Sequence, residues 1–326
     1  MTQTLPTQVL PTEPLATAAP TATPTATPPP VAATDRFVSS IAEISEVRFR
    51  EPERIPELLA TRRRRTIAGA DGRLMIVACD HPARGALAAS GNPTAMANRI
   101  ELLERLVTAL ARPGVDGLLA TADIAEDLLL LGALEDKLVF SSINRGGIQG
   151  SVFEIDDRNT GYDVQGTIEA RFDGGKLLTR IDVDDPATVA MLEAQGKVVS
   201  ELNRARLVAM VEPFLSRRVN GKVVNDLSPD AVIRSIAIAQ GLGASSAYTW
   251  MKLPVVHEME RVMAATTLPT LLLGGDPDGD PDETYAAWQA ALALPAVRGL
   301  VVGRTMLYPA DDDVAKAVDT AVSLVR

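Results

Sequence analysis

The sequence predicts an α/β protein, a (β/α)8 TIM barrel preceded by a disordered N-terminal tail. Three observations support this fold class. Short apolar runs, typical of buried strands, alternate with stretches whose apolar residues follow helical spacing. The alternation repeats eight times, and eight parallel strands close such a barrel. The chain after the tail, residues 35–326, has the length of one barrel of this kind.

The tail comes first in the chain. Residues 1–34 are mostly threonine, proline and alanine, as in "TAAPTATPTATPPPVAAT", and we expect this segment to be disordered. It lacks the basic start and continuous apolar stretch of a secretory signal, and no run is apolar enough to span a membrane. We therefore expect a cytoplasmic protein with two parts. These are the tail at 1–34 and, at 35–326, the barrel with an N-terminal helical extension.

The elements of the barrel follow in strand–helix order. The expected strands are 73–81, 115–123, 137–147, 174–183, 206–214, 247–255, 269–276 and 298–305. Helical spacing is clear at 92–112, 124–134, 163–172, 186–205 and 228–243, and a helix is expected after each of the last three strands. An open doubly wound sheet is the main alternative. It often carries a glycine-rich phosphate turn after its first strand, and "CDHPARGAL" does not match that turn.

Charge and cysteine content narrow the function classes. The formal net charge of −10 argues against general nucleic-acid binding. The basic run Arg62–Arg65 is an exception, for which a solvated helix end or a subunit contact is favoured over an anion site. The single cysteine, Cys79, excludes an intrachain disulfide, fits a cytosolic protein and is interpreted as a small buried hydrophobe.

Active sites of (β/α)8 barrels lie at the carboxyl ends of the strands, where the sixth strand carries a lysine. Tyr248, Trp250 and Lys252 share one face of this strand, because side chains alternate with a period of two. A buried ammonium is costly, so we expect Lys252 to point into the polar barrel mouth, with Tyr248 and Trp250 as substrate-binding residues beside it. A neutral lysine there can attack a carbonyl to form a Schiff base. A structural ion pair with an inward carboxylate is the alternative that this strand alone leaves open.

Other strand ends favour a catalytic site. Asp80 ends the first strand, Lys176 lies on the fourth and Glu212 on the fifth. A second inward lysine lowers the pKa of Lys252, and a nearby carboxylate can move protons. An inward lysine and glutamate can also simply neutralise each other, and it is the joint presence of these residues that favours chemistry.

The last two strands end in glycines followed by an arginine. Gly274, Gly275 and Gly303 allow backbone N–H groups to approach an anion, and Arg304 adds a planar cation. Tight turns also need glycine, but many barrels bind phosphate at these two loops. We expect a phosphate site there.

These motifs resemble the class I, Schiff-base aldolases of the (β/α)8 superfamily, which includes deoxyribose-phosphate, archaeal-type fructose-bisphosphate and tagatose-bisphosphate aldolases. The resemblance covers residues 72–326 and rests on "ACDHPARGAL", "GGKLLTRIDVDD", "MVEPF", "WMKLP", "GG" and "VVGR". It implies that Lys252 is the Schiff-base nucleophile and that Glu212 transfers protons. It also implies that Asp80 and Lys176 orient the substrate and tune charge. The archaeal-type fructose enzymes have a tyrosine near the place of Glu212, so this chain sides with the tagatose group.

The resemblance implies an aldolase for a small phosphorylated sugar, a ketose or keto-sugar acid, without a cofactor and in a homo-oligomer. It suggests cleavage of 6-phospho-5-dehydro-2-deoxygluconate in inositol degradation, with Arg145 or Arg180 meeting the sugar-acid carboxylate. Related motifs vary at His81, whose role stays open. Residues 144–163 match no family segment and are expected to shape the substrate end.

Two other functions remain as alternatives. In a metal-dependent aldolase or lyase, Asp80 and Glu212 would hold magnesium, because the histidines His81 and His257 lack a zinc-ligand pattern. Activity that survives chelation would count against it. A non-catalytic metabolite-sensing barrel is disfavoured, because a sensor does not require an imine-forming lysine.

Overall fold

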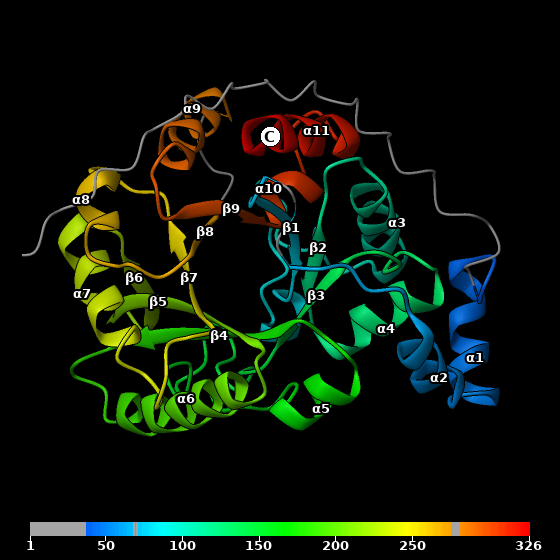
Figure 1. Ribbon diagram of the computed structural model, residues 1–326, viewed down its shortest axis with the longest axis horizontal. Helices are drawn as coiled ribbons and strands as arrows, with labels where there is room; N and C mark the ends of the chain where they lie inside the picture. Colours follow the sequence, from blue (N-terminus) through cyan, green and yellow to red (C-terminus); the bar gives the residue numbers. More distant parts are fainter. Residues whose placement is uncertain (1–36, 68, 70, 275–280) are drawn as a thin grey trace, which may run out of the picture.

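The computed structural model describes residues 37–67, 69, 71–274 and 281–326, and the predicted tail and Gly275 lie outside them. Eight parallel strands form a closed barrel (Figure 1), since the sheet runs β4-β3-β2-β1-β9-β8-β7-β5 and β4 also pairs with β5. The prediction of a (β/α)8 TIM barrel is confirmed. The barrel strands are β1 (Leu74–Cys79), β2 (Gly117–Ala120), β3 (Leu138–Ser142), β4 (Gly174–Ile181), β5 (Val208–Val219), β7 (Thr249–Pro254), β8 (Thr270–Leu273) and β9 (Val297–Val302).

Helices surround the barrel, and short ones precede it (Figure 1). Local signals define several helix starts: the Asn98 side chain caps α3, and Ser228 caps α7 with proline at its first position. No helix within the described ranges is long and apolar enough to cross a membrane. The helices are η2 (Ile41–Glu43), α1 (Ile44–Arg50), α2 (Arg54–Thr61), η3 (Pro82–Arg84), α3 (Arg99–Leu110), α4 (Ala122–Leu130), α5 (Val164–Glu169), α6 (Ala187–Arg204), α7 (Pro229–Ala239), α8 (Met259–Met263), α9 (Pro281–Leu292), α10 (Arg304–Leu307) and α11 (Val314–Val325).

Two apolar clusters hold the fold together. The larger one lies between strands and helices and includes the buried Cys79, as predicted. The smaller one fills the barrel interior with residues such as Ile76, Phe140 and Met210, and Trp250 packs against it with its ring 6.3 Å from that of Phe140. Because these apolar side chains fill the barrel interior, the open space of the barrel lies at the carboxyl ends of the strands.

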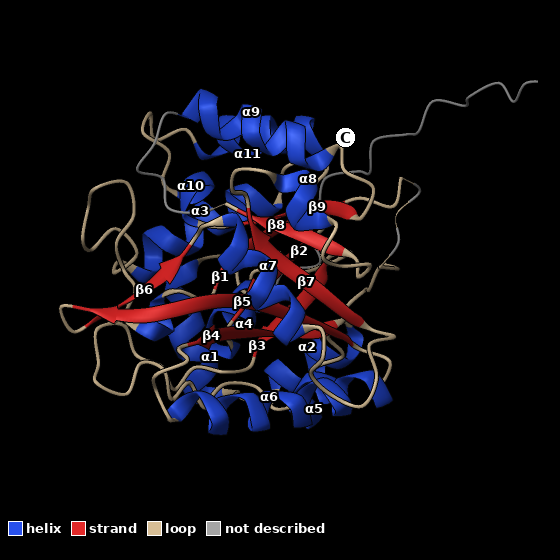
Figure 2. Cartoon of the chain, turned by 90° about the vertical axis from the view of Figure 1, so that its left-hand side faces the viewer, coloured by secondary structure: helices blue, strands red, loops and turns tan. Residues whose placement is uncertain are grey.

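The fifth strand is longer than predicted. It continues past Phe214 to Val219 and turns through Asn220 and Gly221 into β6 (Lys222–Asp226), which pairs antiparallel with it. Asn220 and Gly221 both have positive φ, 51° and 79°, as a tight hairpin turn requires. Figure 2 shows this hairpin projecting beyond the barrel.

The basic run Arg62–Arg65 braces the amino-terminal end of the barrel. Arg62 is buried and donates hydrogen bonds to the carbonyl oxygens of Leu134, Lys137 and Arg171, at 3.3, 2.8 and 3.2 Å. Arg64 pairs with Asp173 at 2.8 Å and Arg65 with Asp116 at 2.5 Å, and these aspartates stand directly before β4 and β2. Arg62, Arg64 and Arg65 therefore brace the barrel directly after the end of α2, and Arg63 and Arg64 are exposed there. The subunit contact stays a prediction.

Candidate active site

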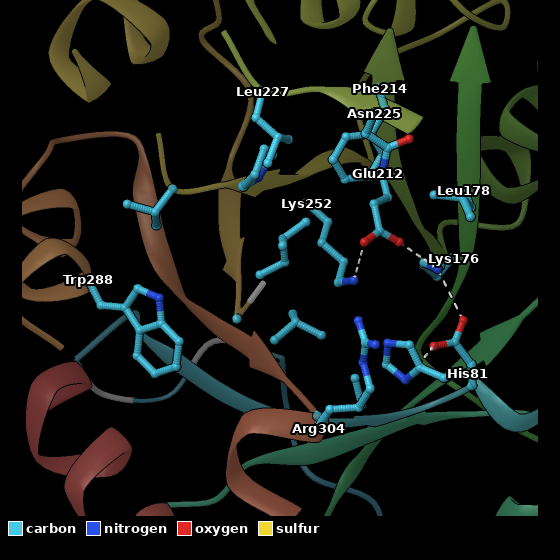
Figure 3. A pocket seen from close by; sticks show the side chains of 18 of the residues that line it. His81, Lys176, Leu178, Glu212, Phe214, Asn225, Leu227, Lys252, Trp288 and Arg304 are labelled. Carbon is cyan, nitrogen blue, oxygen red and sulfur yellow. Dashed lines mark hydrogen bonds and ion pairs between the residues drawn. The ribbon is translucent and has the colours of Figure 1, made fainter. Parts of the chain in front are cut away.

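A cavity of about 680 Å³ opens at the carboxyl ends of the strands. Figure 3 shows its charged wall, where side chains from several strands converge, and the indole of Trp288 across from it. The charged lining comprises Asp80, His81, Arg84, Lys176, Glu212, Lys252, Glu283 and Arg304. The apolar lining includes Leu178, Phe214, Leu227, Val255, Leu273, Ala287, Trp288 and Val301.

Four buried charges of alternating sign cross the cavity. Glu212 on β5 contacts both lysines: its Oε1 lies 2.5 Å from Lys252 Nζ and its Oε2 lies 2.5 Å from Lys176 Nζ. Lys176 Nζ also contacts Asp80 Oδ2 at 3.0 Å, and Ser142 Oγ donates a hydrogen bond to the same oxygen at 3.0 Å. Three strands, β4, β5 and β7, and the residue that directly follows β1 thus bring together the four residues that the sequence singles out for catalysis.

The two lysines differ in their electrostatic state. Burial lowers the pKa of Lys252, and the positive charge of Lys176 lowers it further, against the opposing effect of Glu212. Burial also acts against the charge of Lys176, but Asp80 and Glu212 together outweigh it, so the pKa of Lys176 is raised. Lys176 is therefore a permanent cation, and Lys252 is the amine that loses its proton more readily.

The carboxyl groups of Glu212 and Asp80 are both ionised. Burial raises the pKa of Glu212, but Lys176 and Lys252 more than compensate and hold that pKa at about 2. The pKa of Asp80 lies well below its ordinary value for a similar reason, since the positive charge of Lys176 outweighs the effect of burial. Glu212 is thus an anion that can accept a proton beside Lys252.

His81 lies in the cavity as a neutral imidazole. Burial, together with the positive charges of Arg304 and Lys252, lowers its pKa to about 4 against the opposing effect of Asp80. Its Nδ1 is 4.0 Å from Asp80 Oδ1. The imidazole is therefore a neutral polar group at ordinary pH.

The glycine and arginine ends of β8 and β9 line the same cavity. A Cβ atom at Gly303 would collide with the carbonyl oxygen of Ala78, and one at Gly274 would lie 2.5 Å from Val302 Cγ1. Both positions therefore have a packing reason to be glycine. Arg304 follows directly and adds a cation to this side of the cavity.

Four predicted binding residues are not among those that line the cavity. Tyr248 comes directly before β7 and Trp250 lies on it, and at about 3.3 Å per residue both lie towards the opposite end of the barrel from Lys252. The alternation of the strand correctly predicts the face of Trp250 but not its depth. Arg180 is held by Glu154 and Asp157, and Arg145 is buried beside the cavity within residues 144–163.

Other cavity residues were not predicted as site residues. Arg84 follows β1 in η3, Asn225 and Leu227 come from the hairpin, and Trp288 comes from α9. The Asn-Gly pair at 220–221 is the sequence signal that announces the hairpin. Trp288 cannot be predicted from the residues at the strand ends, because it lies within a helix.

A cation already lies between Asp80 and Glu212, because Lys176 contacts both carboxylates. A magnesium ion between them would have to displace this ammonium. In the ranges that the structure describes, no group of three or more His, Cys, Asp or Glu residues is placed to hold a metal ion.

Fold and cavity together define a (β/α)8 barrel with two lysines buried around one glutamate. The chain belongs to the Cgl0159-like family, whose model matches residues 72–322. It is 57% identical to Cgl0159 from Corynebacterium glutamicum, whose crystal structure matches with a TM-score of 0.86 over 91% of this chain and 99% of that one.

More distant structural neighbours are fructose-bisphosphate aldolases. One is a Schiff-base-forming fructose-1,6-bisphosphate aldolase, 20% identical, with a TM-score of 0.56 over 83% of this chain and 100% of that one. Another, from Slackia heliotrinireducens, is 13% identical, with a TM-score of 0.60 over 85% and 91%. At these identities the likeness concerns the fold. None of the curated proteins matches the chain.

Proposed function

We propose that this protein is a class I aldolase that cleaves a phosphorylated ketose or keto-sugar acid through a Schiff base on Lys252. The observation that carries the proposal is the contact of one buried, ionised carboxylate, Glu212, with two buried lysines of different pKa. A structural ion pair needs one lysine. The second lysine, Lys176, provides a fixed positive charge that favours the neutral, nucleophilic form of Lys252.

The reaction follows from these positions. The neutral amine of Lys252 adds to the substrate carbonyl carbon to give a carbinolamine. Its hydroxyl takes a proton from solvent and leaves as water, which gives a protonated imine, and this proton returns to solvent on the final hydrolysis. Cleavage of the adjacent carbon–carbon bond sends its electron pair to the imine nitrogen, while Glu212 takes the proton of the hydroxyl that becomes the aldehyde. Glu212 then returns a proton to the enamine carbon, and water hydrolyses the imine to release the ketone and free the lysine.

The phosphate of the substrate belongs at the ends of β8 and β9. Gly274 and Gly303 bring backbone close to the cavity, and Arg304 adds a cation with a planar donor pattern that suits phosphate. A phosphate site accepts any phosphorylated substrate. The candidate 6-phospho-5-dehydro-2-deoxygluconate and simple ketose phosphates are therefore both compatible with this end of the cavity.

The test is turnover of phosphorylated ketoses and keto-sugar acids in excess chelator, with the released ketone phosphate as readout. We expect cleavage that chelation does not change. Activity lost on chelation and restored by magnesium would instead support the metal-dependent alternative.

In the same assay, Arg304→Ala should mainly raise KM for phosphorylated substrates, by about tenfold or more, because a charge-assisted contact to phosphate is lost. Unphosphorylated analogues should be affected much less. Equal losses for both substrate types would show that Arg304 acts only through the fold.

A further inference from the structure

Three buried arginines lie beside the cavity: Arg145 belongs to the segment 144–163, and Arg84 and Arg180 contact this segment. Arg84 pairs with Asp157 and donates to the carbonyl oxygens of Asn144 and Gly147. Arg180 pairs with Glu154 and approaches Asp157 at 3.7 Å. The exposed fractions of Arg84 and Arg180 are both 7%. These two arginines are therefore matched by Glu154 and Asp157 of the segment.

Arg145 is the third arginine and has no such match. Its exposed fraction is 6%, and its Nε and Nη2 atoms are buried without a hydrogen-bond partner among the described residues. Arg84 and Arg180 each have one further buried nitrogen, Nε, in the same state. Three guanidinium groups against Glu154 and Asp157 leave one positive charge in excess. Asp80 also acts on Arg145, but Asp80 is already paired with Lys176. A buried guanidinium without a carboxylate partner of its own is costly.

The position of the cluster relates it to the substrate. Arg84 lines the cavity, and Arg145 follows β3, whose last residue Ser142 bonds Asp80. Asp80 and Arg84 are close enough to Arg145 to act on its charge in opposite directions. In the closed order of strands, β3 and β4 lie opposite β8 and β9. The arginine cluster and the phosphate end therefore lie on opposite sides of the cavity, with Lys252 and Glu212 on the wall between them.

We propose that Arg84, which lines the cavity, binds a carboxylate at the end of the substrate opposite its phosphate, with the positive charge of Arg145 buried beside it. The substrate is then a phosphorylated keto-sugar acid. This inference rests on the proposed aldolase function and decides between its two substrate classes. The single excess positive charge matches a carboxylate rather than a dianionic phosphate. The planar fork of arginine also suits a carboxylate, which it can bind through two parallel hydrogen bonds. The aldehyde released on cleavage is then an oxo acid.

The test runs the full chain in the direction of synthesis, with dihydroxyacetone phosphate as the ketone that forms the imine. The acceptor aldehydes are matched pairs: 3-oxopropanoate with propanal, and 4-oxobutanoate with butanal, with glyceraldehyde 3-phosphate as the phosphorylated acceptor. We expect kcat/KM for an oxo acid to exceed that of its neutral partner by about tenfold or more, because a charge-assisted contact is gained.

Variants of the cluster identify the residue responsible. Arg145→Gln should reduce the ratio of oxo acid to neutral aldehyde about tenfold, and Arg145→Lys, which keeps a cation, should retain part of it. The matched control is Arg158→Gln in the same segment, since Arg158 is exposed and paired with Asp156, and it should leave the ratio unchanged. If Arg145→Gln does not fold, the wild-type ratios and Arg145→Lys decide.

The contrary outcomes are distinct. Equal kcat/KM for oxo acids and neutral aldehydes, a preference for glyceraldehyde 3-phosphate, or equal losses for all acceptors in Arg145→Gln would each overturn the carboxylate site. Borohydride trapping with dihydroxyacetone phosphate alone separates these results from failure of the proposed function. A trapped adduct without carboxylate preference overturns only the site, whereas no adduct at all overturns the aldolase itself and the site with it.

Discussion

Replacing Lys252 with arginine is expected to abolish turnover while the barrel stays folded. The guanidinium keeps the positive charge that Glu212 contacts at 2.5 Å, but it is not deprotonated in a protein and cannot form an imine. Loss of a covalent nucleophile costs on the order of 10⁴-fold or more in kcat. The measurement is retro-aldol turnover, with the thermal midpoint as the check on folding.

Lys197→Arg provides the matched control for this change. Lys197 is an exposed residue on α6 that pairs with Glu193, so the same substitution there should leave turnover unchanged. Retention of substantial turnover in folded Lys252→Arg would remove Lys252 from the chemistry and make it a structural partner of Glu212.

Glu212→Gln is expected to lower turnover by about 10²–10⁴-fold while imine formation remains detectable. Glutamine keeps the shape of the side chain but cannot accept the proton that the cleavage step releases. Glu212 also raises the pKa of Lys252, so its removal should lower that pKa and shift imine formation to lower pH. Measurements of turnover and of borohydride-trapped adduct against pH separate the two effects.

A Glu212→Gln variant with normal turnover would exclude Glu212 as the proton-transfer residue. Asp80 would then be the remaining buried carboxylate of the lysine network, since it contacts Lys176 at 3.0 Å. Tyr248 could not take over the proton transfer, because it lies before β7, away from the carboxyl end that carries Lys252.

The barrel can be read from the sequence because its strands are buried on both faces. Such strands appear as nearly continuous apolar runs, and a charged residue within a run must point to a place where charge is tolerated. This reasoning places Lys252, Lys176 and Glu212 in one cavity, and the structure brings them within contact distance.

Depth along a strand is harder to predict than its face. Trp250 has the predicted face, but it packs against Phe140 inside the barrel, because the period of two does not tell where the cavity ends. The hairpin after β5 was missed although Asn220 and Gly221 are a strong turn signal, and with it Asn225 and Leu227 of the cavity wall.

The hydrogen-bond and charge partners of the buried arginines could not be predicted at all. Arg62 donates to carbonyl oxygens 72 to 109 residues further along the chain, and Arg180 on β4 pairs with Glu154, 26 residues earlier. These contacts depend on how distant segments pack and have no local sequence pattern. The unmatched charge of Arg145 depends on the carboxylates that Arg84 and Arg180 occupy, so it has no local sequence pattern either.

The most direct measurement is the site of borohydride trapping. Borohydride added during turnover reduces an imine to a stable secondary amine, and the mass gain is mapped by peptide analysis. Lys252 should carry the adduct, and Lys176 should not, because Asp80 and Glu212 keep its ammonium charged while burial and Lys176 favour the neutral form of Lys252. An adduct on Lys176 would reverse the two roles, and active protein without any lysine adduct would contradict the Schiff-base mechanism.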